Sequence, residues 1–317
     1  MEETVALHPR IRAPLVEKGN VVSQLVLDLT VYLVEPSVDE FDAIFELYRQ
    51  VCPKDRLVAY AMDETVDWDD VESPILTRRG REAERLGIPF PFVEVVRQRI
   101  RDGRGFTFQI WDAQETDSFS LCVRRVRVGE EKYAFARFMF PLGTEPAVLQ
   151  TLALELADAV RLHSGHGGLC LSYDAWRKFR GFTVNYGRAK RWWGIDLEDL
   201  NGTLPLMKGH IKGAQWITIL GNSFVERVES ISLLETRMSD KVQRGRCLYG
   251  TVLVAGAGPV VGDQHLPNPG LDAYESVAAA VESITVDQHP DFDGEHFISN
   301  GDTVGWLRRF TDPDGWR

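Results

Sequence analysis

The residues best suited to chemistry lie in the C-terminal half of the sequence, where a glycine-rich segment ends in an aspartate. The segment Gly256-Ala-Gly258-Pro-Val-Val-Gly262-Asp263 follows an expected strand, and glycines after a strand can hold a dinucleotide phosphate. Pro259, however, stands where the phosphate-binding helix should begin, and no βα unit with a ribose-binding acid follows. We therefore expect a turn in which the glycines take positive φ and Asp263 caps the local backbone.

A second segment, Asp287-Gln-His-Pro-Asp-Phe-Asp-Gly-Glu-His296, gathers carboxylates and imidazoles, which are common metal ligands. Read as a calcium loop, it has His289 at the first ligand position and Asn300 at the last, and calcium needs more hard oxygen ligands than this. Zinc could use His289 and His296, although nothing in the sequence fixes two further ligands. The sequence favours a solvated polar loop, and we expect neither a metal nor a cofactor.

The sequence carries none of the catalytic signatures considered. No Gly-x-Ser-x-Gly elbow, His-Glu-x-x-His pair or Walker phosphate loop occurs. His163-Ser-Gly-His166 lies at the expected end of a helix, where a histidine can interact with the C-terminal dipole. None of the seven histidines stands beside an evident nucleophile. We assign no catalytic residue and expect a protein that is not an enzyme.

One short segment is strongly acidic and contains a tryptophan. Its members are Asp63, Glu64, Asp67, Trp68, Asp69, Asp70 and Glu72, with no base among them. Such a patch could imitate the phosphates of nucleic acid, with Trp68 as an apolar anchor, because tryptophan is enriched among interface hot spots. The alternative is a solvated loop with Trp68 in the core.

Residues 176–193 show the opposite charge. Six lysines and arginines are interleaved with six aromatic residues and no acid, as in a platform that binds single-stranded nucleic acid. The net charge of −11 argues against that interpretation, and aromatic residues at such spacings are usually part of a core. We expect no direct binding of nucleic acid.

The composition indicates a globular protein of one or two domains. The chain has 317 residues, of which 44% are hydrophobic, enough for a sizeable core. No signal peptide is visible at the start, and no apolar run reaches the length of a membrane span. The four cysteines are widely scattered, as is typical of free thiols in a reducing compartment. We expect a cytoplasmic protein that does not bind membranes.

The hydrophobic periodicity predicts the elements that must position these segments. Strands are expected at 23–34, 57–61, 105–111, 119–128, 132–140, 169–173, 215–221, 231–235 and 247–255. Helices are expected at 37–51, 77–86, 89–101, 145–163 and 272–281, with a glycine-rich turn at 164–168. Hairpin-like runs outnumber strict β-α-β alternation, so we expect an α+β fold with mostly antiparallel or mixed sheets and helices packed on them.

We expect the chain to divide into a loose arm and two halves that resemble each other in fold. The arm would span residues 1–20, the N-terminal α+β half 21–145 and the C-terminal α+β half 146–317. The second half would carry the glycine-, tryptophan- and aspartate-rich segments.

Three ordered stretches resemble the type VI secretion immunity family whose members are partners of VRR-Nuc-type nuclease toxins. They are Trp193-Gly-Ile-Asp196, residues 211–221 (IKGAQWITILG) and the glycine-rich segment that ends at Asp263. The resemblance covers roughly residues 165–312 and departs from the family pattern at Trp193 (usually proline), Gln215 (usually asparagine) and residues 225–228 (usually Gly-Gly). The matching residues are Gly194, Asp196, Gly213, Trp216, Thr218, Gly221, Gly258, Pro259, Gly262, Asp263 and Trp306.

The resemblance implies an immunity protein that neutralises a cognate type VI-secreted antibacterial toxin by occluding its active site or DNA-binding cleft. Most of the matching residues then determine the fold: Trp216 would pack the core, and Asp196 and Asp263 would cap backbone. The acidic segment of residues 63–72 would contact the toxin, since a nuclease cleft must be basic. Two alternatives stay open. One is an enzyme of unrecognised type that uses the 256–263 and 289–296 loops. The other is a structural or adaptor component of a secretion system.

Overall fold

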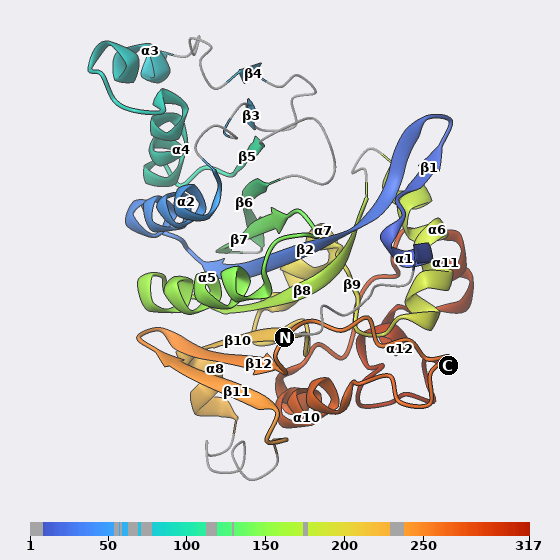
Figure 1. The fold of residues 1–317 in the computed structure, drawn as a ribbon. Helices are drawn as coiled ribbons and strands as arrows, with labels where there is room; N and C mark the ends of the chain where they lie inside the picture. The colour runs from blue at the N-terminus through green and yellow to red at the C-terminus, as the bar shows by residue number, and fades with distance from the viewer. Residues whose placement is uncertain are drawn as a thin grey trace.

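A computed structural model describes residues 9–53, 57, 59–62, 69–70, 78–111, 119–128, 130–173, 177–228 and 238–317. Its strands form one 12-stranded sheet in the order β11-β12-β10-β8-β2-β7-β6-β5-β3-β4, with β1 paired to β2 and β9 paired to β8 (Figure 1). All the pairs are antiparallel except β8 with β9. The expected α+β class with a mostly antiparallel sheet is confirmed.

The strand bounds are β1 Leu15–Glu17, β2 Asn20–Val34, β3 Ala59–Met62, β4 Asp69–Asp70, β5 Phe106–Trp111, β6 Ser120–Val128, β7 Glu131–Phe140, β8 Ser164–Tyr173, β9 Asp196–Leu197, β10 Ile217–Gly221, β11 Val242–Cys247 and β12 Gly250–Ala255. The helices are α1 Pro9–Arg12, α2 Val38–Val51, α3 Arg78–Arg85, α4 Pro91–Arg101, α5 Pro146–Ala159, α6 Lys178–Arg191, α7 Leu200–Thr203, α8 Asn222–Arg227, α10 Asp272–Val281, α11 Glu295–Asn300 and α12 Thr303–Leu307. Two 3₁₀ turns, η3 Leu204–Met207 and η4 Glu282–Ile284, complete the set.

The long strand β2 is the spine of the sheet. It pairs with β7 on one side and with β8 on the other, so that Leu27 lies opposite both Phe140 and Leu169. Such a strand is buried on both faces, which explains its nearly continuous apolar run. The pairing of β2 with β8 carries the sheet across the expected boundary at residue 145. The division into two halves stays a prediction, as does the arm, whose residues 9–20 include α1 and β1.

The expected glycine-rich turn at 164–168 is wrong, because these residues begin the central strand β8. The preceding helix α5 ends at Ala159 rather than at residue 163. Gly167 explains the error: a Cβ at this position would lie 2.9 Å from the Asp28 carbonyl oxygen and 2.8 Å from Leu29 Cδ1. The glycines therefore allow a close approach between β8 and β2 and do not reverse the chain.

The expected strand at 247–255 is confirmed as β12, although it begins at Gly250 and its first residues form the turn of a hairpin. Strands β11 and β12 are joined by Leu248 and Tyr249, with Cys247 opposite Gly250. The expected strand at 231–235 lies outside the described residues.

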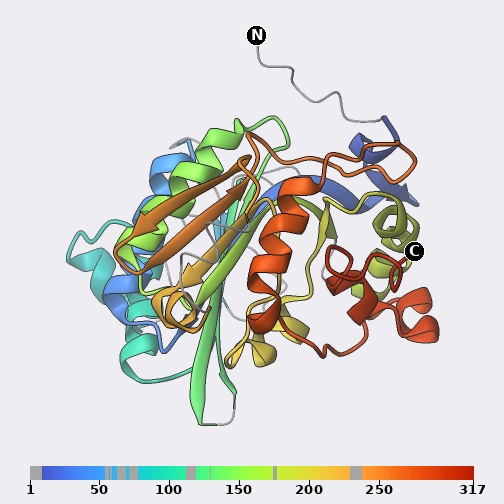
Figure 2. The same ribbon diagram turned by 90° about the horizontal axis from the view of Figure 1, so that it is seen from below.

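Helices cover both faces of the sheet. Phe41 of α2 packs edge-to-face on Phe106 and Phe108 of β5, and α4 and α5 lie in the same layer as α2. The C-terminal helices α6, α10, α11 and α12 lie on the other side of the sheet (Figure 2). Among the described residues, no helix is both long and apolar enough to cross a membrane.

Candidate functional site

A row of polar side chains crosses the centre of the sheet on the face turned away from α2 and α5. Strand register places Arg137 of β7 opposite Thr30 of β2, Thr30 opposite His166 of β8, and His166 opposite Thr218 of β10. Opposed residues point to the same face of a sheet, so these four side chains form one line. Buried polar groups need partners. Arg137 pairs with Asp28 of β2, whereas the partners of His166 come from the segments that cover this face.

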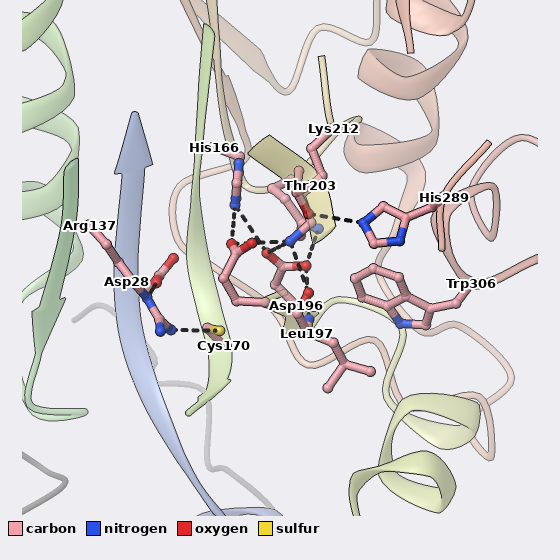
Figure 3. Close-up of polar contacts among 12 residues, drawn as sticks. Asp28, Arg137, His166, Cys170, Asp196, Leu197, Thr203, Lys212, His289 and Trp306 are labelled. Carbon is pink, nitrogen blue, oxygen red and sulfur yellow. Dashed lines mark hydrogen bonds and ion pairs between the residues drawn. The ribbon is translucent and has the colours of Figure 1, made fainter. Parts of the chain in front are cut away.

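His166 forms an ion network with three residues of the covering segments, and we call this network the buried hub: His166, Asp196, Glu198 and Lys212 (Figure 3). His166 Nε2 lies 2.6 Å from Glu198 Oε2 and 3.3 Å from Asp196 Oδ2. The Lys212 ammonium lies 2.8 Å from Asp196 and 3.1 Å from Glu198, and it donates to the Leu197 carbonyl at 2.9 Å. The parallel pairing of β9 with β8 is what brings Asp196 and Glu198 beside His166.

A second ion pair lies next to the hub on the same face. Arg137 donates from Nε to Asp28, and its other nitrogen lies 3.4 Å from Cys170 Sγ (Figure 3). Together with the hub this gives three carboxylates, one lysine, one arginine and one histidine. The formal charges cancel when His166 carries a proton.

The pKa shifts of His166, Asp196 and Glu198 favour that charge state, whereas burial raises the pKa of Asp28 despite the adjacent Arg137. Burial lowers the pKa of His166, but the charge of Glu198 and the hydrogen bonds to Asp196 and Glu198 together outweigh it and raise this pKa to about 9. Burial would also raise the pKa of Asp196, yet the Lys212 ammonium holds it well below its usual range. His166 is therefore a structural cation at neutral pH.

The arrangement is poorly suited to catalysis or to metal binding. The hub side chains are only 1% to 4% exposed, so a substrate has no route to them. Asp28, His166 and Glu198 could each offer a ligand atom within 4.8 Å of the others. A metal ion there would meet the Lys212 ammonium and the Arg137 guanidinium, which already neutralise these carboxylates. The hub is best described as a structural network that holds β8, β9 and the 211–216 segment together.

Two of the three signature stretches contribute residues to this hub, and the third packs against both of them. The first pairs with the third: Trp193 N–H donates to Gly262 O at 3.1 Å, and Gly194 N–H donates to Val261 O at 3.0 Å. Gly194 is required at this crossing, because a Cβ there would lie 2.0 Å from Val260 O. Asp263 closes the contact with two bonds to Arg191, at 2.9 and 2.7 Å, and accepts the His265 N–H.

The second stretch supplies Lys212 and Gln215, which bond the two oxygens of Asp196. Asp196 caps the backbone N–H of Leu197 as expected, and in addition it is the centre of the ion network. Trp216 is fully buried and donates its indole N–H to Gly256 O, which ties the second stretch to the third. Trp306, also fully buried, lies 5.6 Å from the Lys212 ammonium.

The remaining signature residues lie around these contacts. Gly221 ends β10, Thr218 bonds the backbone of Gln215, and Gly213 has positive φ. Gly258 and Pro259 follow β12, where Pro259 lies near Gly168.

The two loops proposed for an unrecognised enzyme have separate partners. His289 is bonded by Thr203 at 3.1 Å and by the Pro290 carbonyl, whereas His296 packs against the Tyr186 ring at a centroid distance of 5.0 Å. Neither histidine belongs to the metal-like group found among the described residues. Asp263, in the other loop, is committed to Arg191.

The basic segment is also committed to internal partners, in agreement with the expectation that it forms part of the core. Lys178 pairs with Asp199, Arg180 with Glu17, Lys190 with Asp302 and Arg191 with Asp263. Phe182, Trp192 and Trp193 are buried. Four of the segment's cations and three of its rings are therefore held by partners inside the fold, whereas Phe179 of the same segment is 49% exposed.

Most of the expected toxin-contacting segment lies outside the described residues. This applies to Asp63, Glu64, Asp67, Trp68 and Glu72. Asp69 and Asp70 form the edge strand β4, which pairs with Ala59 and Tyr60 of β3.

The sequence reasoning missed the members of the hub and the neighbouring ion pair. A signal did exist for Asp28, an acid inside the apolar run of β2, and for Lys212, a cation inside a buried signature stretch. His166 was hidden because the glycines around it predicted a turn.

The fold and the hub define the structural class: an α+β protein built on one large, mostly antiparallel sheet with a buried polar network at its centre. The sequence profile of the family described as type VI immunity for VRR-NUC matches residues 93–310, and the chain belongs to this family. A solved structure titled as the Pseudomonas aeruginosa T6SS protein PA0821 has the same fold, with a TM-score of 0.72 at 15% sequence identity, over 97% of this chain and 91% of that one. No curated protein matches the sequence.

Proposed function

We propose that this protein binds a VRR-NUC-type nuclease toxin delivered by a type VI secretion system and blocks its active site or DNA-binding cleft. The observation that carries the proposal is the family match, which spans residues 93–310 and therefore includes the hub and all three signature stretches. Inhibition of this kind needs a stable complex and no turnover.

Charge supports the same proposal. The protein has a net charge of −11, and a nuclease must present a basic surface to the phosphates of its substrate. Opposite charge accelerates the encounter of two proteins, and apolar contacts then slow their dissociation. The protein would act in the cytoplasm, where the nuclease meets DNA.

A rescue experiment tests this function. The VRR-NUC domain of a type VI toxin from the same genome would be expressed in cells with and without this protein. We expect the protein to restore growth and, when purified, to stop the domain from cleaving plasmid DNA at an equimolar ratio. Unrescued growth together with undiminished cleavage would overturn the proposal.

The acidic segment of residues 63–72 stays a proposed contact. Lysine at Asp67, Asp69 and Asp70 is expected to weaken binding of the same toxin domain by more than about tenfold, since each reversal places a positive charge before a basic cleft. Unchanged affinity in a calorimetric titration would remove this segment from the interface.

A further inference from the structure

The C-terminal part of the chain has an unusual distribution of charge. Between Arg246 and Arg308 there is no lysine or arginine, whereas nine aspartates and glutamates occur. Three of these acids have ion-pair partners elsewhere in the fold: Asp263 with Arg191, Asp272 with Lys241, and Asp302 with Lys190. The other six are exposed and form no ion pair within the described part of the chain: Glu275, Glu282, Asp287, Asp291, Asp293 and Glu295.

The loop that carries most of these acids is anchored by the residues between them. His289, Phe292 and Gly294 are buried, while Asp291, Asp293 and Glu295 alternate with them and are exposed. Phe292 stacks on Phe182 of α6 at a centroid distance of 4.7 Å. The carboxylates are therefore displayed by a fixed backbone, and little conformational entropy would be lost on binding.

Two large apolar side chains are exposed beside the same loop. Phe179 of α6 is 49% exposed and Ile298 of α11 is 51% exposed. Gly294 packs against the backbone of Thr183, and Thr183 Oγ1 accepts the Glu295 N–H at 3.1 Å. Phe179 lies one helical turn before Thr183 and Ile298 one turn after Gly294, so both flank the α6–α11 contact. Helices α6 and α11 lie side by side in Figures 1 and 2.

We infer that Phe179, Ile298, Asp287, Asp291, Asp293 and Glu295 form a docking face for the basic, phosphate-binding surface of the nuclease toxin. The inference rests on the proposed function and names the surface that performs it.

Charge complementarity identifies the occupant of this docking face. Exposed apolar side chains beside exposed acids are the two components of a protein interface, with anchors that exclude water and charges that steer the partner. The acidic rim repels nucleic acid and anionic membranes, and it attracts a protein that carries clustered lysines and arginines. The nearby cation Arg180 pairs with Glu17 and also interacts electrostatically with Glu295, so it offsets the acidic rim only in part.

The test compares two triple charge reversals that change the net charge equally. The first variant carries Asp291→Lys, Asp293→Lys and Glu295→Lys. The control carries Glu84→Lys, Glu155→Lys and Glu226→Lys, three exposed acids outside the docking face. With the toxin's VRR-NUC domain as the probe, we expect the first variant to lose at least about tenfold in association rate and the control less than about threefold.

A second pair of variants tests the anchors. Phe179→Gln with Ile298→Gln should raise the dissociation constant by more than about tenfold. The control, Leu86→Gln with Leu248→Gln, alters apolar residues that are even more exposed and lie elsewhere, and it should leave the dissociation constant nearly unchanged. All four positions are exposed, so the variants should keep the unfolding midpoint of the wild type.

The outcomes separate the two proposals. If the wild-type protein binds and inhibits the domain but both docking-face variants bind as well as their controls, the docking face is wrong and the immunity function stands. If only the charge reversals in residues 63–72 weaken binding of the toxin domain, the docking face is likewise wrong and the immunity function stands. If the wild-type protein neither binds nor inhibits the domain, both proposals fail.

Discussion

At the scale of single residues, the hub consists of buried charges that pair with one another. Lys212 is enclosed between Asp196 and Glu198 at a side-chain exposure of 3%. Removing one partner of such a network leaves an uncompensated charge in a medium of low dielectric constant, which costs more than the pair contributed. The hub should therefore be sensitive to single substitutions, unlike the ion pairs of the surface.

Lys212→Met is expected to lower the free energy of unfolding by about 3 to 5 kcal/mol, because Asp196 and Glu198 would then share only His166. Urea denaturation followed by circular dichroism measures the change. The control is Lys241→Met, which breaks the exposed pair with Asp272 and should cost less than about 1 kcal/mol. Equal effects of the two substitutions would contradict the structural role of the hub.

The proton on His166 predicts a pH dependence. The folded-state pKa of about 9 exceeds the ordinary value of 6.5, so the stabilisation is complete below pH 6.5 and is lost as the pH rises through 9. Unfolding free energies should fall by up to about 3 kcal/mol across this window. His166→Gln cannot titrate and should show a flatter profile between pH 6.5 and 9, and a wild-type profile identical to that of the variant would refute the assignment.

At the scale of elements, the signature stretches act as crossings between backbone segments. Gly194 passes so close to Val260 that no side chain fits, and the same contact aligns Trp193 with Gly262. Gly194 therefore allows the glycine-rich third signature stretch to pack directly against the first.

Two glycine substitutions compare this close backbone contact with an exposed glycine of a helix. Gly194→Ala should destabilise the protein by more than about 2 kcal/mol, since its Cβ would overlap Val260 O and overpacking forces the backbone apart. Gly187→Ala, in the exposed middle of α6 with no atom within 4 Å of the added Cβ, should stabilise it by roughly 0.5 to 1 kcal/mol. Differential scanning calorimetry would show shifts of opposite sign, and a neutral Gly194→Ala would refute the close contact.

At the scale of the whole molecule, the charge of the protein is distributed unevenly. The bases of α6 pair with acids from other parts of the chain, including Glu17 and Asp199, while the C-terminal acids stay exposed. The long-range field is therefore acidic on the side formed by α10, the 287–295 loop and α11.

Salt should reveal this field in the complex with the VRR-NUC domain. Raising the ionic strength from about 0.05 M to 0.5 M shortens the Debye length below the separation of exposed charges. The association rate should fall by at least about tenfold, while the dissociation rate, governed by apolar anchors, should change much less. Stopped-flow fluorescence measures both rates, and an association rate independent of salt would contradict electrostatic steering.

Sequence patterns predicted the strands and helices where periodicity is strong, as for β5, β6, β7, α2 and α10. They failed where glycine can either form a turn or allow close packing of strands. The residues from Ser164 to Gly168 predicted a turn, although their glycines allow β2 and β8 to approach closely. They also could not find the hub, because Glu198 is 32 positions from His166 and Asp28 is 109 positions from Arg137.

The sequence by itself determined the α+β class, the acidic character and the family, since local periodicity, composition and the ordered stretches can be recognised without knowing which residues are in contact. Only the tertiary structure decided that Asp196 of the first signature stretch and Lys212 of the second meet His166 and Glu198. It also decided that four cations of the basic segment pair with acids from other parts of the chain. The physical reason is that buried charge pairs form across strands whose order and register depend on the whole chain, so no local pattern encodes which ions will meet.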